Sequence, residues 1–243
     1  MMIRRGWRTG ALVLATVWLT GCAGTGAQLT QSGFLQDYAR LQPRDDATVA
    51  WLNPSTRPFG ERPLVVEPVV IREQQVEGEV ISLADNRYSN LRVWLRDAVE
   101  ARLKAAGYTV ADEPAPDATR IRLAVTGLMH TPSSLRILEM LPMGALLAGA
   151  KAVTGNRNDD VVMFVELQVR DPRGEVLIEG VQRVNGVAMS PRELAGITPR
   201  QVQAQADVFA LRLADSLQRF DRAHANGTLP VAGNARLATS ARP

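Results

Sequence analysis

Cys22 is the only cysteine in the chain, and two small residues, Thr20 and Gly21, come directly before it. A thiol sulfur is a nucleophile that can be alkylated, and the small side chains before it leave the preceding peptide bond open to a peptidase. A lone cysteine excludes disulfide bonds within the chain and metal clusters held by several thiolates. The chemistry predicted here is therefore cleavage before Cys22 and modification of its sulfur.

The residues before Cys22 have the three parts of a secretory signal: a basic start, an apolar run and a small-residue cleavage region. The apolar run is too short to cross a bilayer, which takes about 20 apolar residues as a helix. The sequence Leu19-Thr20-Gly21-Cys22 resembles the bacterial lipobox, where a diacylglyceryl group is added to the cysteine sulfur. We therefore expect residues 1–21 to be a lipoprotein signal peptide and Cys22 to carry a membrane anchor.

The residues after Cys22 bear on where the anchored protein would be sorted. Ala23 follows the cysteine, whereas in enteric bacteria an aspartate at that place commonly retains a lipoprotein in the inner membrane. This resemblance favours the outer membrane. In either membrane, each buried methylene of the acyl chains would contribute about 0.8 kcal/mol of membrane affinity. The small, uncharged, glycine-rich tract 23–28 is typical of a flexible tether.

Three other sets of polar residues could do chemistry, and each has a simpler structural interpretation. His130 has no Gly-x-Ser-x-Gly elbow in this sequence to activate, so we interpret it as an exposed histidine at a strand end. Asp171 and Glu175 flank a tight turn and are expected to keep it soluble rather than to form a catalytic pair. The segment 155–160 resembles an acidic calcium loop, but Arg157 stands in its middle and no glutamate closes it. We therefore predict no catalytic residues, no metal site and no cofactor.

The segment 137–155 is the most unusual part of the sequence, because it is apolar and rich in alanine and glycine but too short to span a bilayer. One interpretation is an apolar helix packed on a sheet. Another is a surface for a second subunit or the bilayer, because Gly144 and Ala148 lie one helical turn apart and would let two helices approach closely. A ligand pocket is the third. We name Gly144, Leu147 and Ala148 as the candidate surface, for an unknown envelope protein or for self-association.

The composition is that of a folded globular protein. The 243 residues are 46% apolar and 22% charged, which suits a single core. The formal net charge is +3, but three arginines would leave with the signal peptide, so 25 basic and 25 acidic residues would remain. Basic residues are scattered rather than clustered, which argues against nucleic-acid binding. The two histidines are far apart, which argues against a histidine metal site.

Apolar periodicity predicts the elements that would position these residues. Apolar residues at helical spacing predict a long helix capped by Ser82 and Asp85 and ending at Gly107. A second helix opens at Thr198-Pro199 and would bury Phe209 and Leu213 in the core. Strands are predicted at 64–71 with a break at Glu67-Pro68, 108–110, 120–128, 161–170 and 175–184, the last two joined as an antiparallel hairpin by the turn 171–174.

The rest of the chain is expected to lie outside this core. Residues 22–61 read as a lipidated tether followed by an irregular, proline-rich wrap, with a short docking turn at 34–41 and with Trp51 and Phe59 pinned into the domain. Residues 224–243 read as a disordered tail. The predicted fold is one α+β domain over 62–223, with an antiparallel or mixed sheet of about five strands and two main helices. The expected order is strand, helix, strand, strand, hairpin, helix.

Four pieces of sequence taken together resemble a known family. They are Leu19-Thr20-Gly21-Cys22, Ser32-Gly33-Phe34-Leu35-Gln36-Asp37-Tyr38, Val65-Val66-Glu67-Pro68-Val69 and Asp171-Pro172-Arg173-Gly174-Glu175. With the apolar insert, this combination is similar to the bacterial lipoproteins known as domain of unknown function 3313, over residues 19 to 222. That family has no assigned activity, so the resemblance implies no catalytic residues.

The expected function is therefore a non-enzymatic lipoprotein of the outer membrane, facing the periplasm, that serves as a structural, assembly or binding accessory of the cell envelope. One alternative is a subunit of a secretion or transport assembly, since the order of elements is similar in outline to curli-type secretion components. The other is an envelope hydrolase whose catalytic residues converge only in three dimensions.

Overall fold

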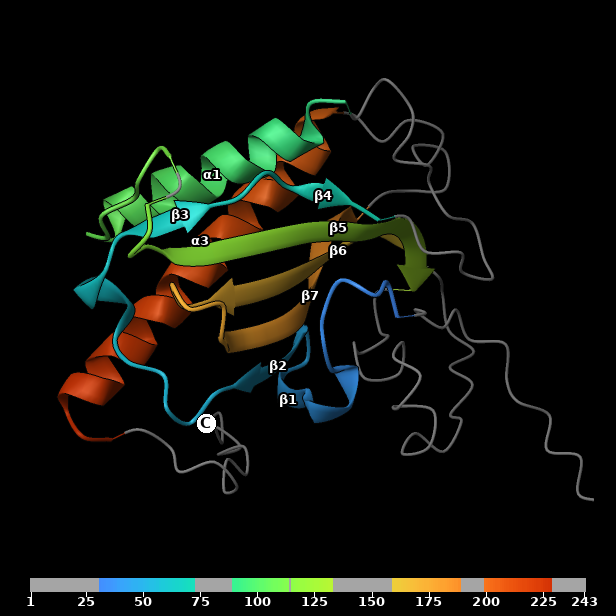
Figure 1. Cartoon of the computed structure of the whole chain (residues 1–243). Helices are drawn as coiled ribbons and strands as arrows, with labels where there is room; N and C mark the ends of the chain where they lie inside the picture. Colours follow the sequence, from blue (N-terminus) through green and yellow to red (C-terminus); the bar gives the residue numbers. More distant parts are fainter. Residues whose placement is uncertain (1–30, 73–88, 114, 133–158, 189–198, 229–243) are drawn as a thin grey trace, which may run out of the picture.

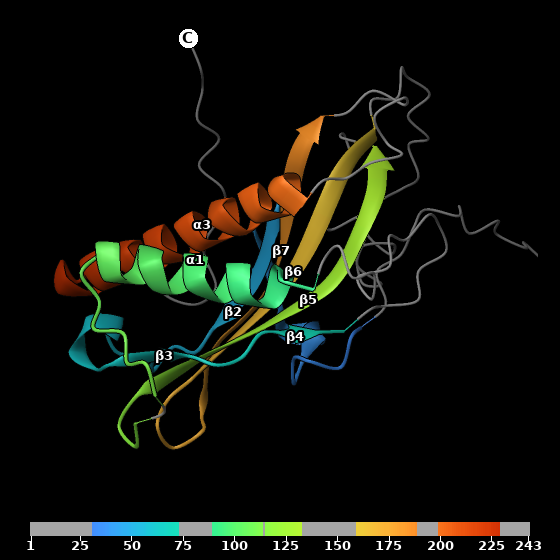
Figure 2. The ribbon, with the colours of Figure 1, turned by 90° about the horizontal axis from the view of Figure 1, so that it is seen from above.

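The computed structural model describes residues 31–72, 89–113, 115–132, 159–188 and 199–228. These residues form a mixed, seven-stranded sheet with two long helices on one of its faces (Figures 1 and 2). The strands run in the order β1-β2-β7-β6-β5-β3, and β4 also pairs with β5. Their bounds are β1 Gln42–Asp45, β2 Thr48–Leu52, β3 Leu64–Val66, β4 Val70–Ile71, β5 Thr119–Pro132, β6 Asp159–Arg170 and β7 Val176–Ala188. The helices are α1 Leu91–Ala105 and α3 Pro199–Ala225, with short 3-10 turns η1 Tyr38–Arg40 and η2 Phe59–Glu61.

The long antiparallel strands β5, β6 and β7 form the centre of the sheet. The turn between β6 and β7 is the predicted one: Gly174 has a φ of 87°, and Asp171 Oδ1 accepts the backbone N–H of Arg173 at 2.9 Å and of Glu175 at 2.8 Å. The strands β3 and β4 run parallel to β5 and are separated by the predicted break at Glu67-Pro68. The α+β class, the hairpin and this break are therefore confirmed.

The main core lies between the helices and the sheet. Four leucine and valine residues of α1 are almost fully buried, and from α3 Phe209 is 1% exposed and Leu213 is 5% exposed. Helix α1 ends as predicted before Gly107, whose φ is 90°. The predicted start near Asp85 is wrong, because residues 89 and 90 form a turn and α1 begins at Leu91.

The prediction that 22–61 is an irregular wrap is wrong for its second half, because β1 and β2 form a hairpin that pairs with β7. This pairing brings β2 close to Gly180, where a Cβ atom would lie 3.0 Å from the carbonyl oxygen of Val49. Glycine therefore makes room for the neighbouring backbone. Pro43 has no backbone N–H to donate, and it can lie in a strand here because β1 is at the edge of the described sheet. The hairpin also explains why the sheet has more than five strands.

The strand predicted at 108–110 is reduced to a single bridge between Val110 and Leu64. The docking turn predicted at 34–41 is confirmed. Its residues Phe34, Leu35 and Leu41 are buried on the sheet face opposite the helices. They form a second, smaller apolar cluster there with residues of β2, β6 and β7, among them Phe164. The segment 31–41 therefore covers part of the open face of the sheet.

Candidate functional site

Polar side chains occupy the open face of the sheet next to the Phe34 cluster, and two buried glutamates organise them. The carboxylate of Glu179, on β7, is completely buried. It accepts hydrogen bonds from the backbone N–H of Gln36 at 2.7 Å, from Arg40 Nη2 at 2.7 Å and from Gln168 Nε2 at 2.6 Å. The donors come from the docked segment as well as from β6, so this carboxylate holds segment 31–41 on the sheet.

Glu166, on β6, also binds segment 31–41 to the sheet. Its Oε2 atom accepts hydrogen bonds from Ser32 Oγ at 2.8 Å and from the Tyr38 hydroxyl at 2.7 Å. Burial raises the pKa of Glu166, although these hydrogen bonds partly oppose the effect. Burial also raises the pKa of Tyr38. Both glutamates therefore have structural partners, and several of these partners belong to segment 31–41, which follows the predicted tether.

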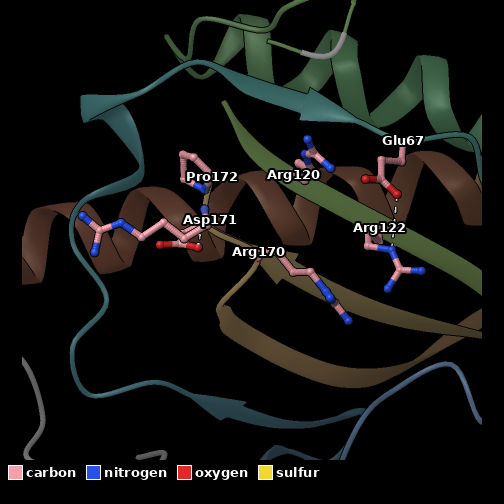
Figure 3. Close-up of a pocket in the computed structure, with 8 residues that line it drawn as sticks. Glu67, Arg120, Arg122, Arg170, Asp171 and Pro172 are labelled. Atoms are coloured by element: carbon pink, nitrogen blue, oxygen red, sulfur yellow. Dashed lines mark hydrogen bonds and ion pairs between the residues drawn. The ribbon is translucent and has the colours of Figure 1, made fainter. Parts of the chain in front are cut away.

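A pocket of about 310 Å³ lies beside these networks, near the turn between β6 and β7 (Figure 3). Its walls carry more basic than acidic side chains. The acidic ones are Glu67 and Asp171. The basic ones are Arg120 and Arg122 from β5, Arg170 from the end of β6, and Arg173 from the turn. The pocket is therefore positively charged.

Two of these arginines share one neutral acceptor. Gln168 Oε1 accepts hydrogen bonds from Arg122 Nη1 and from Arg170 Nε, the latter at 2.7 Å. Arg122 Nε also donates to Glu67 Oε2 at 3.2 Å, the contact drawn as a dashed line in Figure 3. Because Gln168 also donates to Glu179, it links the pocket to the network that holds segment 31–41. Chemically, this arrangement can bind an anion.

The structure does not test most of the residues that the sequence singled out. Cys22 and the candidate surface of Gly144, Leu147 and Ala148 lie outside the described residues. The described strands β5 and β6 are paired to their ends, with Pro132 opposite Asp159. His130 lies in β5 opposite Val161.

Neither helix of the described residues is both long and apolar enough to cross a membrane. In the same part of the chain, no three histidine, cysteine, aspartate or glutamate side chains come together in a group that could hold a metal ion.

The arginine-lined pocket was not predicted from the sequence, although part of its pattern is visible there. Arg120 and Arg122 alternate with apolar residues in β5, so strand periodicity alone places them on one face. The register that sets Arg170 opposite Arg120 and Gln168 opposite Arg122 is a long-range property that a single sequence does not reveal.

Comparisons with known proteins identify a family but no activity. Residues 30–213 match the family described as "Protein of unknown function (DUF3313)". The "Uncharacterized lipoprotein YdcL" of Escherichia coli (strain K12) is 26% identical over 177 residues, which are 66% of this chain and 75% of that protein.

Similar solved structures include lipoproteins and an oligomer. The PelC dodecamer from Paraburkholderia phytofirmans is 12% identical, with a TM-score of 0.40 over 70% of this chain and 96% of that one. Lipoprotein GNA1162 from Neisseria meningitidis is 12% identical, with a TM-score of 0.31 over 63% of this chain and 99% of that one. TM-scores this low give neither structure any weight for function. The family match, by contrast, covers most of the chain, so this protein belongs to the DUF3313 family, as its sequence motifs predict.

Proposed function

We propose that this protein is a lipoprotein of the outer membrane, anchored through a lipid on Cys22 and facing the periplasm, where it serves as a non-enzymatic structural, assembly or binding accessory of the envelope. The observation that carries the proposal is the sequence Leu19-Thr20-Gly21-Cys22 behind a basic and apolar start. The similarity to a curated protein named as a lipoprotein supports it. Ala23, in place of a retaining aspartate, favours the outer membrane.

The attachment of Ser32 to the sheet limits the distance between a lipid on Cys22 and the folded domain. Ser32 is already fixed to the sheet through Glu166 Oε2, and the Ser32 carbonyl oxygen accepts a hydrogen bond from Arg72 at 3.4 Å. At about 3.5 Å per residue, the chain from Cys22 to Ser32 extends no more than about 35 Å. An anchor on Cys22 would therefore keep the domain close to the membrane surface.

A non-enzymatic role is supported by how the buried carboxylates are used. Glu166 and Glu179 accept hydrogen bonds from Ser32, Tyr38 and Arg40, which belong to the docked segment. A catalytic carboxylate would need to face a substrate instead. We therefore assign both glutamates to fixing segment 31–41.

Metabolic labelling with a fatty-acid probe tests the anchor, and separation of inner and outer membranes tests the sorting. We expect the wild-type chain to be labelled and to sediment with the outer membrane. Cys22→Ser should stay unlabelled and keep its signal peptide. Ala23→Asp is the matched control, because it should leave labelling intact while moving the protein to the inner membrane. Equal labelling of the wild type and Cys22→Ser would overturn the proposal.

A further inference from the structure

Three arginines of the pocket lack a carboxylate partner within the described part of the chain. Arg122 is paired with Glu67, and the Asp171 carboxylate caps the backbone of its own turn. Arg170 donates only to the neutral oxygen of Gln168. Arg120 and Arg173 are both exposed, and the described residues offer neither side chain an ion pair. The pocket therefore has a surplus of positive charge that the described residues leave uncompensated.

The register of the sheet places two of these arginines at facing positions on neighbouring strands. Arg120 and Arg170 are direct partners across the antiparallel pair of β5 and β6. Side chains at such positions have Cβ atoms about 4.5 to 5.5 Å apart, and like charges there destabilise a sheet. An anion lying between the two guanidinium groups would remove this repulsion.

Gln168 orients the arginines before any ligand arrives. Its Oε1 atom accepts from both Arg122 and Arg170, so two guanidinium groups converge on one neutral oxygen (Figure 3 shows the two arginines). Each group uses few of its N–H donors in these bonds, and a guanidinium carries five. The remaining donors form forks that match the oxygen atoms of a phosphate.

We propose that this pocket binds a phosphate group through Arg120, Arg122 and Arg170. A phosphate dianion matches the surplus charge, and its several oxygens can accept from more than one guanidinium. The volume of about 310 Å³ is larger than phosphate alone requires, which leaves space for an attached organic group. The phosphate belongs either to a soluble phosphate ester or to a lipid head group. The inference does not depend on the anchor at Cys22.

Calorimetric titration of the full-length protein in detergent, with inorganic phosphate as the probe, tests the site. Arg120→Gln is the main variant, because its side chain has no described partner to lose and the fold should tolerate it. We expect this change to raise the Kd for phosphate about tenfold or more, since a charge-assisted hydrogen bond contributes at least that much. Arg170→Gln should have a similar effect. Arg212→Gln is the matched control, because it removes an equal, exposed charge from α3 on the other side of the sheet.

A second titration separates the two sources of phosphate. Phosphatidylcholine vesicles with and without phosphatidic acid are added to the same protein. Binding that needs phosphatidic acid and is weakened by Arg120→Gln assigns the pocket to a lipid head group. If inorganic phosphate binds and phosphatidic acid does not compete with it, the pocket is assigned to a soluble phosphate ester. The proposal is overturned if neither probe binds the wild type, or if both bind Arg120→Gln and Arg170→Gln as tightly as Arg212→Gln.

Discussion

Arg40 and Glu179 form an ion pair across the open face of the sheet, with Arg40 Nη2 2.7 Å from Glu179 Oε2. The Glu179 side chain is completely buried, whereas 25% of the Arg40 side chain is exposed. The Arg40 guanidinium also lies over the ring of Trp51, 3.6 Å from its centroid. One side chain therefore ties the docked segment to β7 and to β2 at once, and Trp51 contributes to this attachment through Arg40.

Replacing Arg40 by alanine should destabilise the protein. The change removes the arginine that pairs with the buried Glu179 carboxylate, and leaving such a charge without its partner costs about 3 kcal/mol. Urea unfolding of the purified protein measures the difference. Arg44→Ala, on the exposed strand β1, is the control and should change the free energy of unfolding by less than about 0.5 kcal/mol. Equal effects of the two changes would contradict the role given to Arg40.

Replacing Glu166 by glutamine should alter how stability depends on pH. Burial raises the pKa of Glu166 in the folded protein, so folding favours its protonated form. The stability from this group is complete below the pKa of the unfolded chain and is lost as pH rises through the folded pKa. Glu166→Gln stays neutral throughout, so it should gain stability relative to the wild type as pH rises from about 4 towards about 8. Unfolding curves across this range measure the gain, and a constant difference would contradict the shift.

Replacing Phe209 by alanine should cost about 3 to 5 kcal/mol, because the ring is buried between α3 and the sheet. Such a loss is a large part of the roughly 5 to 15 kcal/mol that stabilises a domain of this kind. Thermal unfolding measures it. Val208→Ala on the same helix is the control, since Val208 is 39% exposed, and it should have a much smaller effect.

Replacing Gly180 by valine should loosen the hairpin of β1 and β2 while leaving the helix-side core intact. A Cβ atom there would lie 3.0 Å from the Val49 carbonyl oxygen and 3.2 Å from the Ala50 Cβ atom, so β2 would have to move away. Overpacking of this kind costs about 1 to 3 kcal/mol. Limited proteolysis should show faster cleavage within 42–52. Unchanged cleavage would mean that β2 pairs with β7 without needing the glycine.

The segment 137–155 is tested by Gly144→Arg. If Gly144 and Ala148 face a partner, the variant should stay folded but lose self-association or binding to that partner. If they pack on the sheet, the same change should unfold the domain, because a buried unpaired charge costs several kcal/mol. Circular dichroism and size-exclusion chromatography on the one variant separate these outcomes. A variant that is folded and associates normally would contradict both interpretations.

Periodicity predicted those elements whose pattern is local. The alternation in 161–170 and 175–184 and the turn at Gly174 predicted the hairpin, and the stripe that includes Phe209 predicted the buried face of α3. These patterns succeed because each one reports burial on one side of a single element.

The elements that were missed depend on contacts between distant parts of the chain. Because of Pro43 and Pro54, residues 42–52 were predicted to be irregular. In the structure β2 pairs with β7, and Gly180 leaves space for this pairing. In the same way, the alternation around Arg120 and Arg122 predicted only a solvent-exposed strand face. The register that sets them beside Gln168 and Arg170 makes them part of a pocket.

The outer strands of the described sheet limit how copies of this protein can join. All residues of β1 are exposed and include Pro43, and its pairing with β2 is irregular between Pro43 and Asp45. On the opposite side, β3 and β4 are short and are separated by Pro68. Edges of this kind resist the addition of another strand. Where β1 and β3 form the edge, this structure opposes pairing with a strand of another copy, so any contact between anchored copies at these two strands would have to be made by side chains.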